Sequence, residues 1–265
     1  MPQGLVKGLD VSESEAEELV RGSVALARDG AARGPAGGVR RNLRDGDTGE
    51  EERSWVVASI GPYGAFLADG SEYTGSYGAS TTHAEFKEFH RPRVRLLADA
   101  GVDGFACETM PCLAEIPALL EVLAEEAPGA PAWVSVTVDA SGVRMADGTA
   151  LEELCEIVRR NEQFVAVGVN CVSREVVTGA VRTMRRCMEG WEEGERKTLA
   201  CYPNSGEVWD AEKKEWKKGS ATDRSIESWL EEWVDEGVGM VGGCCRVEPE
   251  EIARMRTWID GKYAA

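Results

Sequence analysis

Apolar residues alternate between two patterns along the chain. Short runs rich in β-branched residues recur six times, and several are almost wholly apolar, as parallel strands buried on both faces tend to be. Longer segments between them carry apolar residues three and four positions apart, which is typical of amphipathic helices. The predicted strands cover 55–60, 104–108, 132–138, 165–170, 198–203 and 239–243, and the predicted helices cover 84–101, 113–128, 150–161, 174–190 and 225–237.

This alternation of strand and helix predicts an α/β fold with a parallel sheet, either doubly wound or closed into a barrel. Pro92 lies inside the first helical pattern and predicts a kink or a helix start there. Segment 34–53 is rich in glycine and charge and indicates an exposed loop, and 204–223 indicates a long excursion after the fifth strand. Because neither a repeat nor a linker is evident, residues 1–265 are expected to form one domain.

Composition narrows the classes of partner. The chain has 265 residues, of which 43% are apolar, and a formal net charge of −17 at pH 7. Such a charge disfavours nucleic-acid and anionic membrane surfaces as partners, and it also favours solubility. The N-terminal residues lack the apolar core of a secretory signal, and no run approaches the roughly 18 apolar residues of a membrane span. A cytoplasmic protein without nucleic-acid or membrane partners is therefore expected.

Cysteine is unusually frequent, with eight residues, but the spacing is not that of a disulfide scaffold. Reduced thiols are expected in a cytosolic protein of this length. Free cysteine is most often a small buried side chain. Five cysteines are expected to be core residues of that kind, namely Cys107, Cys112, Cys155, Cys187 and Cys201, and the two histidines, His83 and His90, are expected to be structural.

Side chains suited to chemistry gather where the predicted strands end. Glu108 ends the second strand, Cys171 follows the fourth, Asn204 follows the fifth, and Cys244 and Cys245 follow the sixth. The carboxyl ends of parallel strands meet at one face of an α/β fold, which is where active sites form. We therefore expect these residues to share one rim.

Three thiols on that rim form a candidate zinc site. Cys244 and Cys245 are adjacent and cannot form a disulfide with each other without strain. Zinc accepts thiolates in a tetrahedral arrangement, and Gly242 and Gly243 would let the backbone approach such an ion. Because Cys171 is distant in sequence and the three form no compact CxxC signature, the pattern alone leaves a metal site and separate core cysteines equally open.

A resemblance to a known family bears on this choice. The motifs GVNC at 168–171 and GGCCR at 242–246 resemble the zinc-binding signatures of the homocysteine S-methyltransferase family. Segments 59–78, 89–116 and 202–207 are similar to further family motifs in the same order, so the resemblance spans nearly the whole chain. The subgroup that it resembles uses S-methylmethionine or S-adenosylmethionine as methyl donor, rather than betaine or a folate.

The resemblance implies a TIM (β/α)8-type barrel and an enzyme that forms methionine. It implies zinc held by Cys171, Cys244 and Cys245, with the sulfur of homocysteine as a further ligand. Metal coordination removes the proton of a thiol that is otherwise mostly protonated at neutral pH. The thiolate then attacks the methyl carbon of the sulfonium donor in an in-line displacement.

The resemblance also implies roles for polar residues of the rim. Glu108 matches the family carboxylate that holds the homocysteine ammonium group, although an acid near a helix N-terminus is an alternative explanation for it. Asn170, within the GVNC motif, and Asn204, within YPNSGE, are the other candidates for substrate binding. Asn204 is further expected to be an oxygen ligand that yields to substrate.

The chain departs from the family pattern at its start. About six strands are predicted, where the family barrel has eight, and segment 10–30 matches the helix that leads into the third family strand. The Asp-Gly-Gly motif of the first family strand is absent from the sequence. We therefore expect an incomplete barrel, N-terminally truncated relative to the family, with its sheet open between 55–60 and 239–243.

Two consequences are expected from the open sheet. Val56 and Val241 should be more exposed than residues inside a closed barrel, and the unpaired strand edges should favour self-association. Because the missing motif helps to bind homocysteine in the family, a non-catalytic zinc-binding remnant is the alternative to an enzyme. A thiol-based redox protein is disfavoured, since no CxxC motif stands at a helix start.

Overall fold

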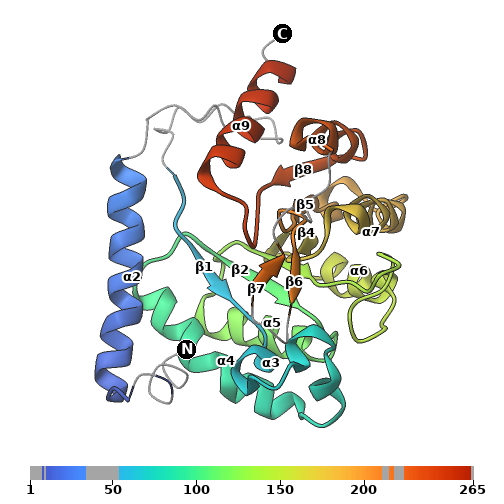
Figure 1. Ribbon diagram of the computed structural model, residues 1–265. Helices are drawn as coiled ribbons and strands as arrows, with labels where there is room; N and C mark the ends of the chain where they lie inside the picture. The colour runs from blue at the N-terminus through green and yellow to red at the C-terminus, as the bar shows by residue number, and fades with distance from the viewer. Residues whose placement is uncertain (1–7, 9, 34–53, 211–214, 218–223, 264–265) are drawn as a thin grey trace.

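The computed structural model describes residues 8, 10–33, 54–210, 215–217 and 224–263. Six parallel strands form one sheet in the order β1-β2-β3-β4-β5-β8 (Figure 1). The strands are β1 (Val57–Ile60), β2 (Gly104–Met110), β3 (Ala132–Val136), β4 (Phe164–Asn170), β5 (Thr198–Tyr202) and β8 (Val238–Val241). The predicted α/β class and all six predicted strands are thereby confirmed.

Helices connect the strands in the predicted alternation. They are α2 (Glu13–Arg33), α3 (Tyr63–Leu67), α4 (His83–Asp99), α5 (Glu115–Glu126), α6 (Leu151–Arg159), α7 (Arg174–Cys187), α8 (Ile226–Asp235) and α9 (Pro249–Tyr263). Short 3-10 turns lie at Ser71–Tyr73, Ser76–Ala79 and Glu193–Glu195. Among the described helices, none is both long enough and apolar enough to cross a membrane.

Helix α4 shows how local sequence sets a boundary. Thr82 and Glu85 form a reciprocal capping box, in which each side chain accepts a hydrogen bond from the other residue's backbone N–H. The helix therefore begins at His83, and it continues through Pro92 to Asp99. Of the two alternatives predicted at Pro92, a kink or a helix start, the helix start is wrong, because the stronger capping signal lies ten residues earlier in the sequence.

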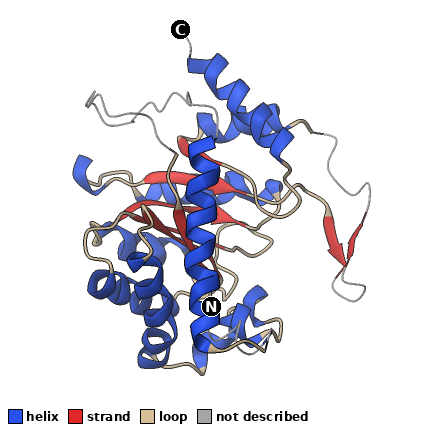
Figure 2. Ribbon diagram, turned by 90° about the vertical axis from the view of Figure 1, so that its left-hand side faces the viewer, coloured by secondary structure: helices blue, strands red, loops and turns tan. Residues whose placement is uncertain are grey.

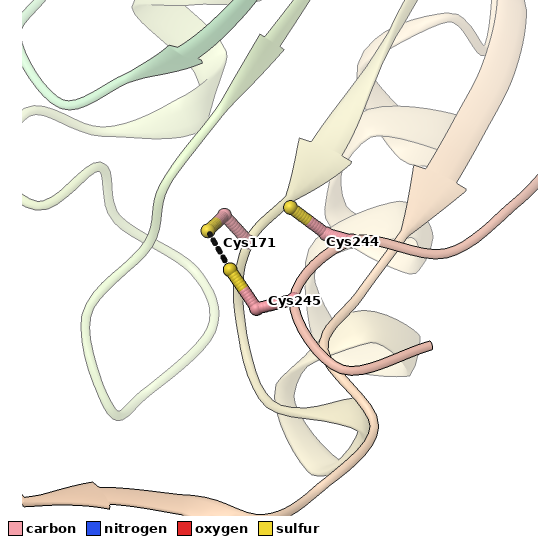
Figure 3. Close-up of side chains that lie close together, drawn as sticks. All are labelled: Cys171, Cys244 and Cys245. Atoms are coloured by element: carbon pink, nitrogen blue, oxygen red, sulfur yellow. Dashed lines mark hydrogen bonds between the residues drawn. The ribbon is translucent and has the colours of Figure 1, made fainter. Parts of the chain in front are cut away.

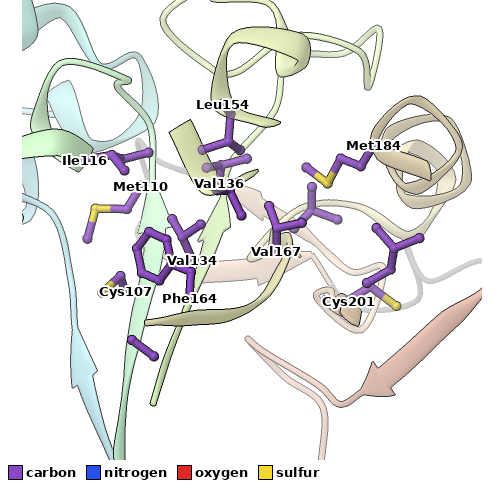
Figure 4. Close-up of a cluster of buried hydrophobic side chains, with 14 of the residues drawn as sticks. Cys107, Met110, Ile116, Val134, Val136, Leu154, Phe164, Val167, Met184 and Cys201 are labelled. Carbon is purple, nitrogen blue, oxygen red and sulfur yellow. The ribbon is translucent and has the colours of Figure 1, made fainter. Parts of the chain in front are cut away.

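The core lies between the sheet and the helices that cover it (Figure 4). Cys107 of β2 and Cys201 of β5 are fully buried among apolar side chains, as predicted, and Cys112 and Cys155 are almost fully buried. Cys187 is only partly buried. None of the eight cysteines forms a disulfide.

The sheet does not close. Among the described residues, β1 and β8 each pair with a single neighbour, so the expected open sheet with six strands is confirmed. Val241 is partly exposed, as predicted, but Val56 is only 8% exposed. The prediction for Val56 is wrong because α2 lies beside β1 (Figures 1 and 2). Arg28 of α2 forms an ion pair with Asp103, and the carboxylate of Asp103 also accepts a hydrogen bond from the backbone N–H of Val56.

The predicted excursion after β5 contains a small hairpin. Strands β6 (Val208–Asp210) and β7 (Glu215–Lys217) pair antiparallel and project away from the main sheet (Figure 2). Segment 34–53, which the sequence predicts to be an exposed loop, lies outside the described residues.

A buried polar cluster anchors the connection that follows β1. Both carboxylate oxygens of Glu115 are used: Oε1 accepts from the backbone N–H of Tyr63 at 2.7 Å, and Oε2 accepts from the hydroxyl of Tyr77 at 2.5 Å. The Nε2 atom of His90 lies 2.6 Å from Oε1. Arg93 donates to Nδ1 of His90 at 2.9 Å, so the proton of a neutral imidazole is on Nε2 and points to Glu115. His90 is thus a structural residue, as expected, whereas His83 lies at the surface beside Glu121.

Candidate metal and substrate site

Three cysteine side chains converge at the carboxyl edge of the sheet (Figure 3). The sulfur atoms of Cys171, Cys244 and Cys245 all lie within 4.8 Å of one another, and those of Cys171 and Cys245 are 3.7 Å apart. All three side chains are partly buried. The predicted convergence is confirmed.

The thiol spacing suits a tetrahedral ion. Two sulfur ligands about 2.3 Å from a zinc ion lie roughly 3.8 Å apart in tetrahedral geometry. The separation of 3.7 Å between Cys171 and Cys245 matches that value. Thiolates are also the soft donors that zinc accepts. The donor set therefore fits zinc and leaves one coordination position open.

The backbone around the thiols is held in uncommon conformations. Cys171 has φ 57° and Arg246, directly after Cys245, has φ 65°. A left-handed conformation is costly for a residue with a side chain and tends to occur at functional sites. At Gly243 an added Cβ would lie 2.2 Å from the side chain of Val247, so the chain needs glycine before the cysteine pair.

The segment after β5 ties the two cysteine loops together. The backbone N–H of Cys244 donates to the carbonyl of Pro203 at 2.9 Å, and the N–H of Cys245 donates to Oδ1 of Asn204 at 3.2 Å. The N–H of Asn204 donates to the carbonyl of Val172 at 2.9 Å. Asn204 therefore holds the cysteine loops in place, and its role as a substrate or metal ligand stays a prediction.

The thiols perturb one another electrostatically. The hydrogen bond with Cys171 lowers the pKa of Cys244 to about 6. The same contact, together with burial, raises the pKa of Cys171, and burial raises that of Cys245. Three thiols packed this closely do not readily ionise together without a cation, because their negative charges repel. The cluster is therefore expected to bind a cation when it ionises.

Glu108 lies on β2 beside the thiols and is held by two hydroxyl groups. Ser59 donates to its Oε1 at 2.5 Å, and the hydroxyl of Tyr202 contacts the same carboxylate. Burial, followed by the charge of Glu108, raises the pKa of Tyr202. Trp133 donates to the Tyr202 hydroxyl at 2.9 Å, which fixes the ring against the sheet. The carboxylate is thus preorganised, as a binding site for an ammonium group requires.

Asn170 is 1% exposed, and its side chain makes three hydrogen bonds within the protein. Its Oδ1 accepts from the backbone N–H of Thr109 at 2.7 Å and from Ser135 at 2.8 Å, while its Nδ2 donates to the Thr109 hydroxyl at 2.8 Å. Thr109 follows Glu108 and has φ 62°, a rare conformation for a β-branched residue. Asn170 therefore stabilises the irregular part of β2 that carries Glu108 and Thr109, and its direct contact with substrate stays a prediction.

Four further residues of the site could not be predicted from the sequence, namely Ser59, Thr109, Ser135 and Tyr202. Tyr202 and Ser135 link Glu108 to Asn170. Thr109 bonds to Asn170, and Ser59 on β1 donates to the carboxylate of Glu108. A signal was present, because Ser135 and Tyr202 are polar residues within mostly apolar strands. Such residues need partners when they are buried, but the sequence does not say which partners they have.

Comparisons with known proteins agree with this geometry. A family model described as homocysteine S-methyltransferase matches residues 5–259. A homocysteine S-methyltransferase of Escherichia coli is 38% identical over 94% of this chain and 73% of its own length. A betaine-homocysteine S-methyltransferase of Drosophila melanogaster is 34% identical over 98% of this chain and 76% of its own length. The metallated form of the Escherichia coli homocysteine methyltransferase MmuM superposes with a TM-score of 0.75 at 32% identity, covering 97% of this chain and 75% of that one.

The protein has a parallel sheet whose carboxyl edge carries three clustered thiols and a carboxylate. These features define it as an α/β protein with a candidate thiolate metal site. Within that class, the chain belongs to the homocysteine S-methyltransferase family. It covers about three quarters of the relatives' length, in agreement with six strands where a (β/α)8 barrel has eight.

Proposed function

We propose that this protein transfers a methyl group from S-methylmethionine or S-adenosylmethionine to homocysteine, forming methionine, at a zinc ion held by Cys171, Cys244 and Cys245. The observation that carries the proposal is the convergence of three sulfur atoms within 4.8 Å, at a spacing that suits zinc, beside the carboxylate of Glu108. Family membership supports homocysteine as the acceptor, and a zinc ion held by thiolates suits a thiol substrate.

Each residue has a defined part in the proposed reaction. Bound zinc would favour the thiolate form of the acceptor at neutral pH. Glu108 binds the ammonium group of homocysteine, and Ser59 and Tyr202 keep its carboxylate in one orientation. The acceptor sulfur forms a bond to the methyl carbon while the donor's carbon–sulfur bond breaks, and the electron pair stays on the donor sulfur, which leaves as a neutral thioether. Alignment is therefore the main task of the protein.

Residues 1–265 are proposed to form one homocysteine-binding domain of a cytoplasmic enzyme in methionine biosynthesis. Asn170 and Asn204 support the site because each accepts a hydrogen bond from the backbone beside a site residue, at Thr109 and at Cys245. Direct binding of substrate by either residue remains part of the proposal.

A methyl-transfer assay tests the function. Zinc-loaded protein with homocysteine and S-methylmethionine is expected to form methionine, and a chelator is expected to remove both the metal and the activity. Zinc content measured on the same samples separates the two classes of protein. Stoichiometric zinc without methionine formation from either donor would favour a non-catalytic zinc-binding protein.

Self-association through the open edges of the sheet is a separate prediction. The outer edges of β1 and β8 have no strand partner among the described residues, and unpaired edges favour association. Sedimentation velocity at increasing protein concentration is expected to show a rising sedimentation coefficient. A single monomeric species across that range would contradict the prediction.

A further inference from the structure

A cavity of about 210 Å³ opens beside Cys171. Loops that follow β1, β3 and β4 line it, together with the start of α7. We call it the Tyr73 pocket, and its lining residues are Tyr73, Thr137, Val138, Asp139, Ala140, Cys171, Val172, Ser173 and Val176. Because Cys171 belongs to both, the pocket adjoins the proposed zinc site.

Two polar side chains of the pocket have unused hydrogen-bonding capacity. The hydroxyl of Thr137 is buried and has no hydrogen-bond partner in the part of the chain that the structure describes. Asp139 accepts hydrogen bonds from Ser141 on Oδ1, while Oδ2 has no partner among the described residues. A buried hydroxyl without a partner is costly, which indicates that a ligand or solvent satisfies it.

The N-terminus of α7 adds a partial positive charge to the pocket. Ser173 is the N-cap of this helix of 14 residues, and its side chain makes no capping hydrogen bond. The first N–H groups of α7 therefore lack a side-chain acceptor from Ser173, and they carry the positive end of the helix dipole. A carboxylate placed in the Tyr73 pocket would satisfy them.

Tyr73 contributes an aromatic face near the thiols. Tyr73 is 67% exposed, and burial, followed by the charges of Glu72 and of the nearby Cys171 and Cys245, raises the pKa of its phenol. An aromatic ring attracts a cation that approaches its face. The sulfonium group of a methyl donor is such a cation, and thiolates beside it would attract it further.

We propose that the Tyr73 pocket binds the amino-acid end of the methyl donor. This inference rests on the proposed function and adds the place and the chemistry of donor recognition. Asp139 pairs with the α-ammonium group, the α7 N-terminus binds the carboxylate, and the Tyr73 ring lies against the sulfonium group. S-methylmethionine and S-adenosylmethionine share this end. Pockets for drug-sized ligands measure about 300–1,000 Å³, so at about 210 Å³ the cavity holds that end, and an adenosyl group would lie outside it.

The assignment predicts a charge-dependent loss of donor affinity. Binding of S-methylmethionine to the zinc-loaded protein, measured by calorimetry, is expected to weaken about tenfold or more in Asp139→Asn, since a hydrogen bond to a charged group is lost. Tyr73→Ala is expected to weaken it about two- to fivefold, whereas Tyr73→Phe keeps the ring and changes it little. Homocysteine affinity and zinc content should be unchanged in all three variants. Asp99→Asn, at an exposed site on α4, is the matched control.

A donor analogue separates recognition of the ammonium group from a general loss of structure. Dimethylsulfoniopropionate carries a sulfonium and a carboxylate but no amino group. The wild-type protein is expected to prefer S-methylmethionine to this analogue, and Asp139→Asn is expected to lose that preference. S-adenosylmethionine is expected to weaken in parallel with S-methylmethionine in the same variant.

The outcomes distinguish this inference from the proposed function. If the wild-type protein binds S-methylmethionine in an Asp139-dependent way but forms no methionine, the function is wrong and the pocket assignment stands. If Asp139→Asn retains wild-type affinity and preference, or if neither sulfonium binds the wild-type protein, the pocket assignment is overturned. Equal weakening of homocysteine and donor in Asp139→Asn would likewise overturn it, because the effect would then not be local to the donor.

Discussion

Replacing Cys244 by alanine is expected to remove bound zinc and methyl transfer together. Cys244 supplies one of three sulfur atoms that lie within 4.8 Å of one another, and its pKa, lowered to about 6, makes it the thiol that ionises most easily. Because the binding energy of a thiolate site is shared among a few ligands, loss of one should weaken zinc binding at least about a hundredfold. Zinc content after dialysis against a competing chelator, measured beside the initial rate, checks the result.

Cys155→Ala is the matched control for that experiment. Cys155 lies on α6, is 1% exposed and belongs to the apolar core, where burial raises the pKa of its thiol. Its loss should cost some packing energy and leave zinc content and activity near wild type. Equal zinc content in the two variants would show that the three convergent cysteines are not the metal ligands.

The order of strands and helices could be predicted because it depends on apolar periodicity. The run 165–170 is almost wholly apolar and became β4, and 174–190 carries a helical stripe and became α7. The same signal is weak where α9 lies, since Met255 is its one buried residue, and no helix is predicted there from the sequence. The hairpin of β6 and β7 was also missed, because its two strands have three residues each.

The site could be predicted in outline but not in its supporting contacts. Placement of Glu108 and the thiols followed from the rule that strands end on one rim, and the resemblance chose among their roles. The link from Glu108 through Tyr202 to Asn170 depends on side-chain directions across four neighbouring strands. Strand register is a property of the folded sheet, so a single sequence does not specify which hydroxyl meets which acceptor.

The burial of Val56 is a second feature that could not be predicted from the sequence. The open sheet was predicted from the number of strands, and the exposure of Val56 was inferred from the open edge alone. Covering by α2 depends on a contact between residues far apart in sequence, the ion pair of Arg28 with Asp103. Periodicity predicts that α2 exists, but it does not predict where the helix docks.

Glu115→Ala is expected to lower the free energy of unfolding by about 3–5 kcal/mol, since removing one partner of a buried ionic cluster leaves the others without compensation. Glu115 is fully buried and accepts hydrogen bonds from Tyr63, Tyr77 and His90. Burial lowers the pKa of His90, so this histidine is neutral and depends on Glu115 as an acceptor for its N–H. Urea unfolding followed by tryptophan fluorescence at pH 7 measures the change.

Glu121→Ala separates the loss of a buried acceptor from the loss of a helical glutamate. Glu121 lies on the same helix as Glu115, but it is about half exposed and pairs with Lys87 at the surface. Surface pairs contribute little because water screens them, so this variant should unfold at nearly the wild-type urea concentration.

The Glu115 cluster joins α4 and α5 to the connection after β1, and that connection carries Tyr73. Loss of Glu115 should therefore also weaken donor binding before global unfolding, and equal unfolding midpoints for the two variants would contradict the assigned role of the cluster.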